Sequence, residues 1–463
     1  LVDSKYSSII VVFYFLLIGG LLPLIVGSWW SNVKSHTKKG LHVDTAASFT
    51  RRLTDRNPGK VVTPFTILDW VLDSYEVKSA FPNKSEEEIN ELISLHFNRK
   101  YAPELENDKL KLISILPKLI NGLIDIATVF RQTEVVLPAA DLLKSIVAAV
   151  KPTGKHQELL QLPFVDPEVV VKQDIKKLGK LMTLPKEEAK TVLGISNEKQ
   201  LDIALNIAES IPTLRIVEAD FKVPGEEHVT PNSTAHLSLK FLVKSPKLKS
   251  CPQVDEKDLV DEETMEYLRD PYKVNEEQPQ LPCSFAPYFP SLVRNRWSGF
   301  LINQKDNKLE ENSTVGQLEN IDLSNLKLTQ EEWIKGDKTV IGTFKFAFPG
   351  TTPAAVGTYP YRLVLKNNTY FGCDIDIPVF MEVKAVPVKP MNIIKKKAED
   401  SDEESDSESD ISDPEEDGLS AALKALQGMA EQKKASDNNA DNDDDDASIF
   451  TDIDTETEDE SEN

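Results

Sequence analysis

The chain lacks the short motifs that mark common catalytic and nucleotide-binding sites. No Gly-x-x-x-x-Gly-Lys-Ser/Thr segment, which would cradle phosphates, occurs in the sequence, and neither do Gly-x-Ser-x-Gly, His-Glu-x-x-His or Gly-x-Gly-x-x-Gly. The six histidines are scattered along 463 residues. We therefore predict that the chain is not an enzyme and has no catalytic residue, although a site assembled from distant residues stays open.

Cysteine is also scarce. Cys251, Cys283 and Cys373 are the only three, and their wide, irregular spacing fits neither a disulfide framework nor a zinc site. The sequence thus predicts no disulfide-stabilised fold, no metal ion and no cofactor, and suits the reducing cytosol.

Charged residues are absent between Tyr6 and Val33, a window that is apolar through most of its length. About 20 such residues span a bilayer as a helix, so we predict that residues 1–35 hold a transmembrane helix and its flanks. Lys and Arg are concentrated just after this window, which predicts that the residues following it lie in the cytosol and that the N-terminus is lumenal. A signal peptide or a buried core helix is the alternative, but an h-region is shorter.

The net charge of −23 belongs to one end of the chain. From Glu399 onward there are 26 acidic and 3 basic residues, so the remainder is neutral. A neutral body argues against nucleic-acid binding, which needs a basic patch. We predict that residues 389–463 form a disordered acidic tail that binds a basic partner.

The tail also holds hydroxyl residues with an acidic residue three positions on, the pattern that acidophilic kinases favour. Phosphorylation would add about −1.5 to −2 charges per site. A solvating acidic tail that contains hydroxyls by chance is the alternative interpretation. The candidate phosphorylation sites are Ser401, Ser405, Ser407, Ser412, Thr451, Thr455 and Thr457.

From residue 36 to about residue 212 the apolar residues recur with helical spacing. Ser85 and the three glutamates after it predict a capped helix start. The stretch 111–130 is apolar nearly all round and predicts a central bundle helix, which Pro117 and Gly122 should kink or interrupt. A second membrane span is the alternative, but three charged residues break the run. Further helices are expected at 142–150, 173–182, 185–193 and 198–210.

Beyond residue 212 the apolar period changes from about 3.6 to 2, which predicts half-buried strands separated by Gly and Pro turns. Such strands are typical of an antiparallel sandwich. Between Ser245 and Lys335 the pattern lapses into charged and Pro-rich sequence, which we interpret as an insertion in a domain of residues 213–388. The insertion carries a strand-like segment at 297–303. The clearest alternating segments are 237–243, 344–348, 359–365 and 375–383.

Several stretches together resemble the Sec sixty-three family, which is the J-domain subunit of the post-translational protein translocation complex of the endoplasmic reticulum. The match looks fungal and covers the chain from the last membrane span of that family onward. The resembling stretches are WWSNVKSHTKKGLHVDTAASF (29–49), LLQLPFVD (159–166), IPTLRIVEADFKVPGEEHVTP (211–231), SFAPYFP (284–290) and FTDIDTETEDE (450–460).

The resemblance implies a membrane-anchored α+β multidomain protein: one transmembrane helix, a cytosolic helical domain at 36–212, a fibronectin-type-III-like β-sandwich with an insertion at about 245–335, and the acidic tail. In that family the sandwich binds cytosolic loops of the protein-conducting channel, promotes its open state and excludes ribosomes. The tail binds the basic N-terminal domain of the partner subunit Sec sixty-two.

One part of the family pattern is missing. No histidine is followed by Pro-Asp, so the J-domain loop that recruits the lumenal Hsp70 chaperone is absent from this chain and belongs to the parent protein only. For the channel contact we select Ser284 and Phe285, because neighbouring prolines stiffen an aromatic segment. The alternative is that Phe285 and Phe289 are core residues.

Two other functions remain open from the sequence. The segments at 159–166 and 361–374 are also similar to C-terminal modules of certain RNA helicases, so a membrane-tethered helicase-like factor or enzyme is an alternative. The acidic tail is also compatible with a chaperone of basic proteins.

Overall fold

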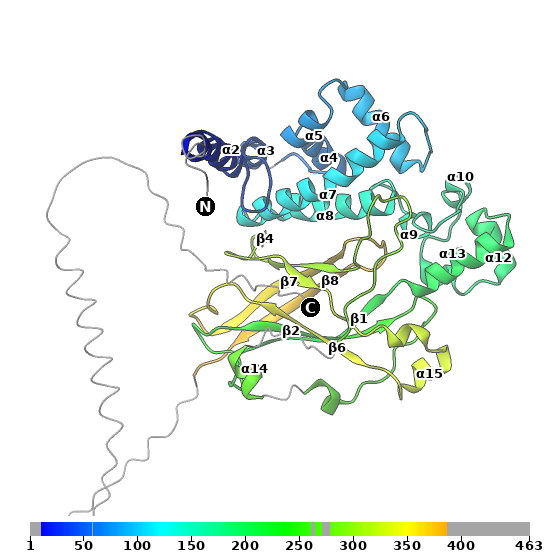
Figure 1. Ribbon diagram of the computed structural model, residues 1–463. Coiled ribbons are helices and arrows are strands. Elements are labelled where there is room, and N and C mark those ends of the chain that lie inside the picture. Colours follow the sequence, from blue (N-terminus) through cyan, green and yellow to red (C-terminus); the bar gives the residue numbers. More distant parts are fainter. Residues whose placement is uncertain (1–10, 58, 261–263, 271–277, 387–463) are drawn as a thin grey trace, which may run out of the picture. The chain divides into compact units, whose positions relative to one another are not determined.

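The computed structural model describes residues 11–57, 59–260, 264–270 and 278–386. These residues form a mixed α and β structure in which a helical region precedes two antiparallel sheets (Figure 1). The candidate phosphorylation sites and the acidic tail lie outside the described residues.

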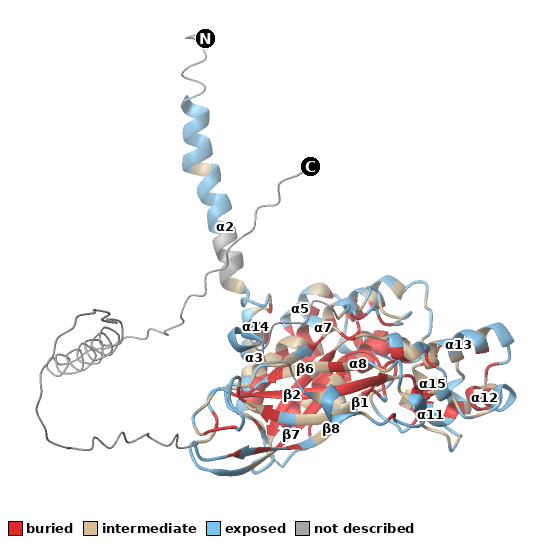
Figure 2. Cartoon of the chain, turned by 90° about the horizontal axis from the view of Figure 1, so that it is seen from below, coloured by how far each residue is buried: buried red, intermediate tan, exposed pale blue. Residues whose placement is uncertain are grey.

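The first described segment is helical from residue 11 to Ser35, with a π-helical turn at Leu17–Leu21 ahead of α2 (Leu22–Ser35). Its apolar side chains are exposed, among them Phe15 and Leu24 (Figure 2). Among the residues that the structure describes, two helical stretches, 11–28 and 106–129, are long and apolar enough to cross a membrane, but half of the second is buried in the protein.

The helical region consists of helices that pack around one core. Their bounds are α3 (Val43–Thr54), α4 (Pro64–Leu72), α5 (Tyr75–Ala80), α6 (Glu86–Phe97), α7 (Glu106–Val129) and α8 (Thr133–Ala148). Further helices lead to the sheets: α9 (Gln157–Leu160), α10 (Pro167–Val170), α11 (Leu178–Leu181), α12 (Lys186–Leu193) and α13 (Glu198–Ser210).

Local signals set several of these boundaries. The predicted capping box at Ser85 is present, because the Ser85 side chain accepts from the Glu88 N–H while the Glu88 side chain accepts from the Ser85 N–H.

The interruption predicted in the central helix is wrong: α7 runs unbroken through Pro117. Leu116 and Ile120 are completely buried on either side of that position, and their packing outweighs the lost hydrogen bond.

A second predicted helix is shorter in the structure than the sequence indicates. Residues 173–182 were expected to be helical, but only α11 (Leu178–Leu181) is formed. The buried imidazole of His156 approaches the Gln173 carbonyl at 2.7 Å, so this backbone is held by a side chain from elsewhere rather than by a helical ladder.

The two sheets are antiparallel. The first has the order β1–β2–β6, and the second has the order β4–β3–β7–β8 with β5 also paired to β3. Their strands are β1 (Thr213–Lys222), β2 (His236–Lys244), β3 (Trp297–Asn303), β4 (Lys308–Leu309), β5 (Gly316–Leu318), β6 (Ile341–Ala347), β7 (Gly357–Asn367) and β8 (Ile375–Val383).

The segment interpreted as an insertion is therefore partly integral to a sheet. Strands β3, β4 and β5 lie within residues 245–335, and β3 pairs along its whole length with β7. The sequence indicated a strand-like segment at residues 297–303 and placed it in the insertion, but Phe300, Leu301 and Ile302 are all buried, on both faces of the second sheet.

The sheets and helices form successive layers within residues 11–386. One core lies between the two sheets and includes Phe241 and Leu363. The other face of the second sheet contributes Phe300 and Val364 to the core of the helical region, and α7 and α8 lie beside that sheet (Figure 1). The second sheet is therefore covered on both faces.

Strand β2 departs from the expected half-buried pattern. Eight of its nine residues are buried, including the polar residues Ser238 and Lys240 that were expected at the surface. The Lys240 ammonium donates to the Thr343 hydroxyl at 3.1 Å. The outer face of this strand packs under a small cluster around Trp333, on α15 (Gln330–Lys335), so tertiary packing hides residues that look solvent-facing in the sequence.

Helix α8 is joined to the second sheet by an ion-pair cluster around a buried lysine. Lys144 is 1% exposed, and its ammonium lies 2.6 Å from Asp374 Oδ1 on the turn between β7 and β8. Lys366 on β7 contacts Asp141 of α8 at 2.8 Å and Asp374 at 3.2 Å. Burial disfavours the Lys366 charge, but the two carboxylates outweigh it and raise the pKa of Lys366.

We expect Asp374→Asn to lower the free energy of unfolding by about 3 to 5 kcal/mol, because it leaves the buried Lys144 charge without its main partner. Urea unfolding followed by circular dichroism measures the change. Adding Lys144→Met should recover much of the lost stability, since the charges of both Lys144 and Asp374 are then removed.

The matched control is Asp202→Asn, which removes the carboxylate of an exposed ion pair with Lys186. It should leave stability nearly unchanged. Equal losses for the Asp374 and Asp202 variants, or no recovery in the double variant, would contradict the assignment of Asp374 as the partner of a buried charge.

His96 gives a pH-dependent prediction. Burial lowers its pKa to about 4, although its Nε2–H donates to the Ile146 carbonyl at 2.7 Å. In the unfolded chain the imidazole takes up a proton below a pH of about 6.5, so its contribution to stability is complete above that pH and is lost as the pH falls towards 4.

His96→Gln should therefore make the free energy of unfolding less dependent on pH. Between pH of about 6.5 and 4 the slope should fall by up to about 1.4 kcal/mol per pH unit. Urea unfolding of both proteins across this range checks it. Parallel curves for the two proteins would show that His96 does not titrate as its burial requires.

Candidate protein-interaction site

The segment selected from the sequence lies in a loop of residues 283–294, called here the 283–294 loop. An antiparallel bridge between Cys283 and Arg294 closes its base, and the Ser284 N–H donates to the Val293 carbonyl at 2.7 Å. The preceding Leu281 N–H donates to the Glu319 carbonyl at 2.9 Å. The loop therefore projects from a backbone that is hydrogen-bonded on both sides.

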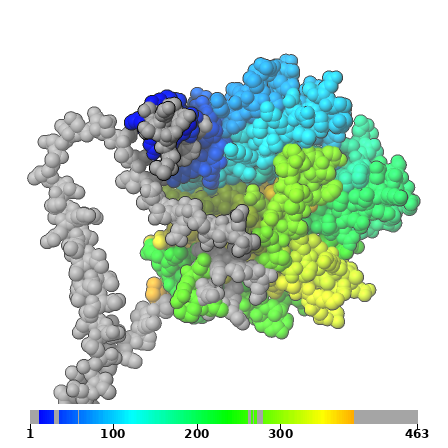
Figure 3. Space-filling view, viewed as in Figure 1, coloured from blue at the N-terminus to red at the C-terminus, as the bar shows by residue number. Residues whose placement is uncertain are grey.

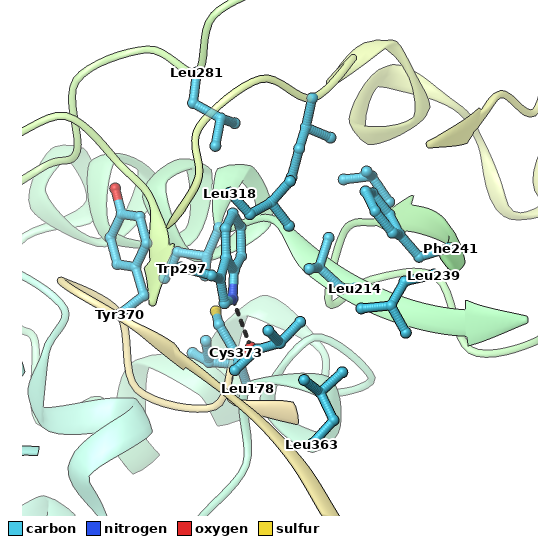
Figure 4. Packing of buried hydrophobic residues seen from close by; sticks show 14 of the residues in the cluster. Leu178, Leu214, Leu239, Phe241, Leu281, Trp297, Leu318, Leu363, Tyr370 and Cys373 are labelled. Atoms are coloured by element: carbon cyan, nitrogen blue, oxygen red, sulfur yellow. Dashed lines mark hydrogen bonds between the residues drawn. The ribbon is translucent and has the colours of Figure 1, made fainter. Parts of the chain in front are cut away.

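The base of the loop rests on the core between the sheets. Trp297, which begins β3, is completely buried, and its indole N–H donates to the Cys373 carbonyl at 2.9 Å (Figure 4). Tyr370 lies on the same side in Figure 4, and its hydroxyl oxygen accepts a hydrogen bond from the Phe285 N–H at 2.7 Å. Burial raises the pKa of Tyr370.

The middle of the loop is fixed to the helical region. The Arg99 guanidinium stacks over the Tyr288 ring at 4.7 Å and donates to the carbonyls of Ala148, Ala149 and Leu162. Burial lowers the pKa of Arg99, while its contacts with Tyr288 favour the charge. These carbonyls include the end of α8, where a cation is favoured by the helix dipole.

The loop presents apolar side chains to solvent on its remaining side. Leu292 is 86% exposed and Phe285 is 39% exposed, whereas Phe289 packs against the helical core and Ser284 is buried. In Figure 3 the lime-coloured chain near residue 300 lies at the surface next to the cyan helices. Exposed apolar residues on a backbone fixed at several points are typical of a protein contact, because little entropy is lost on binding.

The two residues selected from the sequence therefore differ in their exposure to solvent. Phe285 is available to a partner, but Ser284 reaches a partner only through its backbone or after movement. Sequence reasoning missed Leu292 and the supporting Tyr370. Leu292 follows Ser291, and Arg294 comes two positions later, so no extended apolar run marks a surface patch there. The contact between Phe285 and Tyr370, 85 residues apart, has no sequence signal.

No group of three or more His, Cys, Asp or Glu side chains in residues 11–386, outside the gaps given above, is arranged to hold a metal ion. Cys283 is an exposed thiol, and burial strongly raises the pKa of the Cys373 thiol.

Comparisons with known proteins complete the description of this site. The chain is 36% identical over 404 residues to the "Protein translocation protein SEC63" of Saccharomyces cerevisiae, covering 84% of this chain and 60% of the relative. It is 25% identical over 398 residues to the "Translocation protein sec63" of Schizosaccharomyces pombe, covering 83% of this chain and 60% of that relative. No protein-family model matches the chain.

The chain thus spans about 60% of the length of the curated relatives it matches. The level of identity and its extent along this chain confirm the resemblance inferred from the motifs. This chain is a homologue of the SEC63 translocation proteins and belongs to their family, the Sec sixty-three family.

Proposed function

We propose that this chain is the membrane-anchored cytosolic part of an accessory subunit of the protein-translocation channel of the endoplasmic reticulum. In this role it assists the post-translational import of secretory proteins and catalyses no reaction. The observation that carries the proposal is the similarity to two translocation proteins across most of the chain. The activities of the remaining part of those proteins, including Hsp70 recruitment by a J domain, would lie elsewhere in the parent protein.

The exposed apolar helix at 11–28 supports a membrane anchor. Basic residues gather after it rather than before it, which favours a cytosolic location for the rest of the chain and a lumenal N-terminus. Residues 36–212 and 213–388 would then form a helical domain and a fibronectin-type-III-like sandwich. The sheet orders β1–β2–β6 and β4–β3–β7–β8, enclosing one core, fit such a sandwich.

The 283–294 loop is the proposed contact with the cytosolic face of the channel, with Ser284 and Phe285 inside it. If the loop binds the open channel better than the closed one, it shifts the gating equilibrium by that difference in affinity and no more. Occupying this face would also exclude ribosomes. The exposed acidic turn η2 (Glu256–Leu259) offers a complement to basic channel loops.

The acidic tail, residues 389–463, is the proposed attachment for the basic N-terminal domain of the partner subunit Sec sixty-two. The concentration of the chain's net charge in this segment supports the assignment. Phosphorylation at Ser401, Ser405, Ser407, Ser412, Thr451, Thr455 or Thr457 would strengthen the attraction to a basic domain.

A double variant, Phe285→Ala with Leu292→Ala, should weaken recovery of channel subunits with the tagged protein and slow post-translational import into microsomes. Both side chains are exposed, so thermal stability should change little while the apolar contact is lost. Copurification and an import assay on the same membranes provide the measurement.

Phe289→Ala is the matched control, because Phe289 belongs to the same loop but packs inward. It should lower the melting temperature first and affect binding only as stability falls. Unchanged copurification and import in the Phe285/Leu292 variant would rule the loop out as the channel contact, without affecting the assignment to the family.

Deleting residues 389–463 should abolish binding of the basic partner domain while leaving the channel contact intact, because the tail carries the excess negative charge. Binding to the full chain should also weaken as salt is raised. Retention of the basic domain by the tail-less protein, or affinity independent of salt, would refute the tail as its attachment.

A further inference from the structure

A cavity of about 890 Å³ lies beyond the C-terminal end of α8, between the segment 149–156 and α10. The turn that follows α6 forms another wall, and α9 and α10 lie beside this end of α8 in Figure 1. Neither Phe285 nor Leu292 lines the cavity. The space is therefore separate from the exposed side of the 283–294 loop, and it is large enough for several side chains of a ligand.

Three lysines line the cavity without a carboxylate partner. Lys100, Lys151 and Lys155 are all exposed, and none of them forms an ion pair within the part of the chain that the structure describes. The lining contains two carboxylates, those of Asp166 and Glu168, and the Asp166 carboxylate already accepts from the Glu168 N–H at 2.9 Å. The three ammonium groups are therefore available to an anionic ligand.

A fourth cation in the lining, Arg99, is largely buried. Its guanidinium donates to the carbonyls of Ala148, Ala149 and Leu162 and stacks over the Tyr288 ring, but no carboxylate among the described residues pairs with it. A buried charge without a counter-ion favours an anion nearby, because the surroundings screen it poorly. With four cations against two carboxylates, the lining as a whole carries an excess of positive charge.

The remaining lining is largely apolar. Phe97 and Val150 are buried and Leu160 is partly buried, whereas Val171, directly after α10, is 56% exposed. A ligand that carried only charge would leave this apolar surface in contact with water. An apolar group on the ligand would cover it and gain the free energy of burial.

These features favour a peptide over a phosphate group or a nucleic acid. Phosphate is typically held by arginine forks or by the N–H groups of a helix start, but the guanidinium of Arg99 is engaged by three carbonyls. Nucleic acids bind extended basic surfaces, whereas the body of this chain is neutral. Lysines around an apolar surface instead complement carboxylates that flank an aliphatic or aromatic side chain.

We propose that this cavity is a docking site for an acidic peptide segment of a partner protein, in which an aliphatic or aromatic side chain lies between Asp or Glu residues. The apolar side chain occupies the cavity against Leu160 and Val171, and the flanking carboxylates pair with Lys151 and Lys155. The site is independent of the proposed channel contact and takes a partner of the opposite charge to the basic channel loops.

The test measures the binding of fluorescent synthetic peptides to the full chain in detergent micelles by anisotropy. The acidic probe is a short peptide of Asp and Glu with a central Leu-Phe pair. A neutral probe replaces the acidic residues by Asn and Gln, and a polar probe replaces the Leu-Phe pair by Ser. An RNA oligonucleotide is the fourth probe, because it carries negative charge without carboxylates.

The charge variant combines Lys151→Gln with Lys155→Gln. Its matched control combines Lys180→Gln with Lys199→Gln, which removes the same total charge from exposed lysines that do not line the cavity. Val171→Ser tests the apolar contact. All five residues are exposed, so the melting temperature of each variant should stay close to that of the parent.

We expect saturable binding of the acidic probe that weakens as salt is raised. The charge variant should weaken it about tenfold, since two ion pairs are lost, and the control should not. Val171→Ser should weaken binding of the acidic probe but leave the weaker binding of the polar probe unchanged.

Four outcomes would overturn the proposal. They are no saturable binding of the acidic probe, equal losses in the charge variant and its control, equally tight binding of the neutral probe, and tighter binding of the RNA. Since none of the substituted residues lies in the 283–294 loop, such a failure leaves the proposed channel contact untouched.

Discussion

The ion-pair cluster around the buried Lys144, formed with Asp374, Lys366 and Asp141, is the constraint on which the rest of the structure depends. Lys144 is withdrawn from water at the junction between α8 and the β7–β8 turn, and its three partners are partly exposed. A buried charge keeps its partners in place, because any separation exposes it to an apolar environment without compensation. The cluster therefore favours one register between the helical region and the second sheet.

The position of the 283–294 loop follows from that register. Asp374 closes the turn that also carries Tyr370 and the Cys373 carbonyl, which hold Phe285 and Trp297. On the other side, Arg99 joins the end of α8 to Tyr288. The loop is thus held by both layers that the ion pairs connect, and this dual support keeps its exposed apolar side chains in one arrangement for a partner.

Sequence patterns predicted the features that depend on near neighbours. The capping box at Ser85, the buried central helix and the alternating strands from residue 341 onward all follow from local spacing. Patterns failed where distant residues decide. Pro117 stays in an unbroken helix because its neighbours are buried. The strand-like segment 297–303 was placed in an insertion, whereas as β3 it pairs with β7 in the second sheet. Phe285 was identified from its segment, but its support by Tyr370 and the role of Leu292 require the fold.

In the proposed function, an anchored, neutral body contacts a channel through one loop and a basic partner through an acidic tail. The central claim is the proposed contact between the 283–294 loop and the channel, and site-specific photocrosslinking in native membranes tests it most directly. A photoreactive residue at position 292 should form adducts with channel subunits, while one at position 129, which is also exposed but in the helical region, should not. No adduct at position 292, or equal adducts at both positions, would contradict the claim.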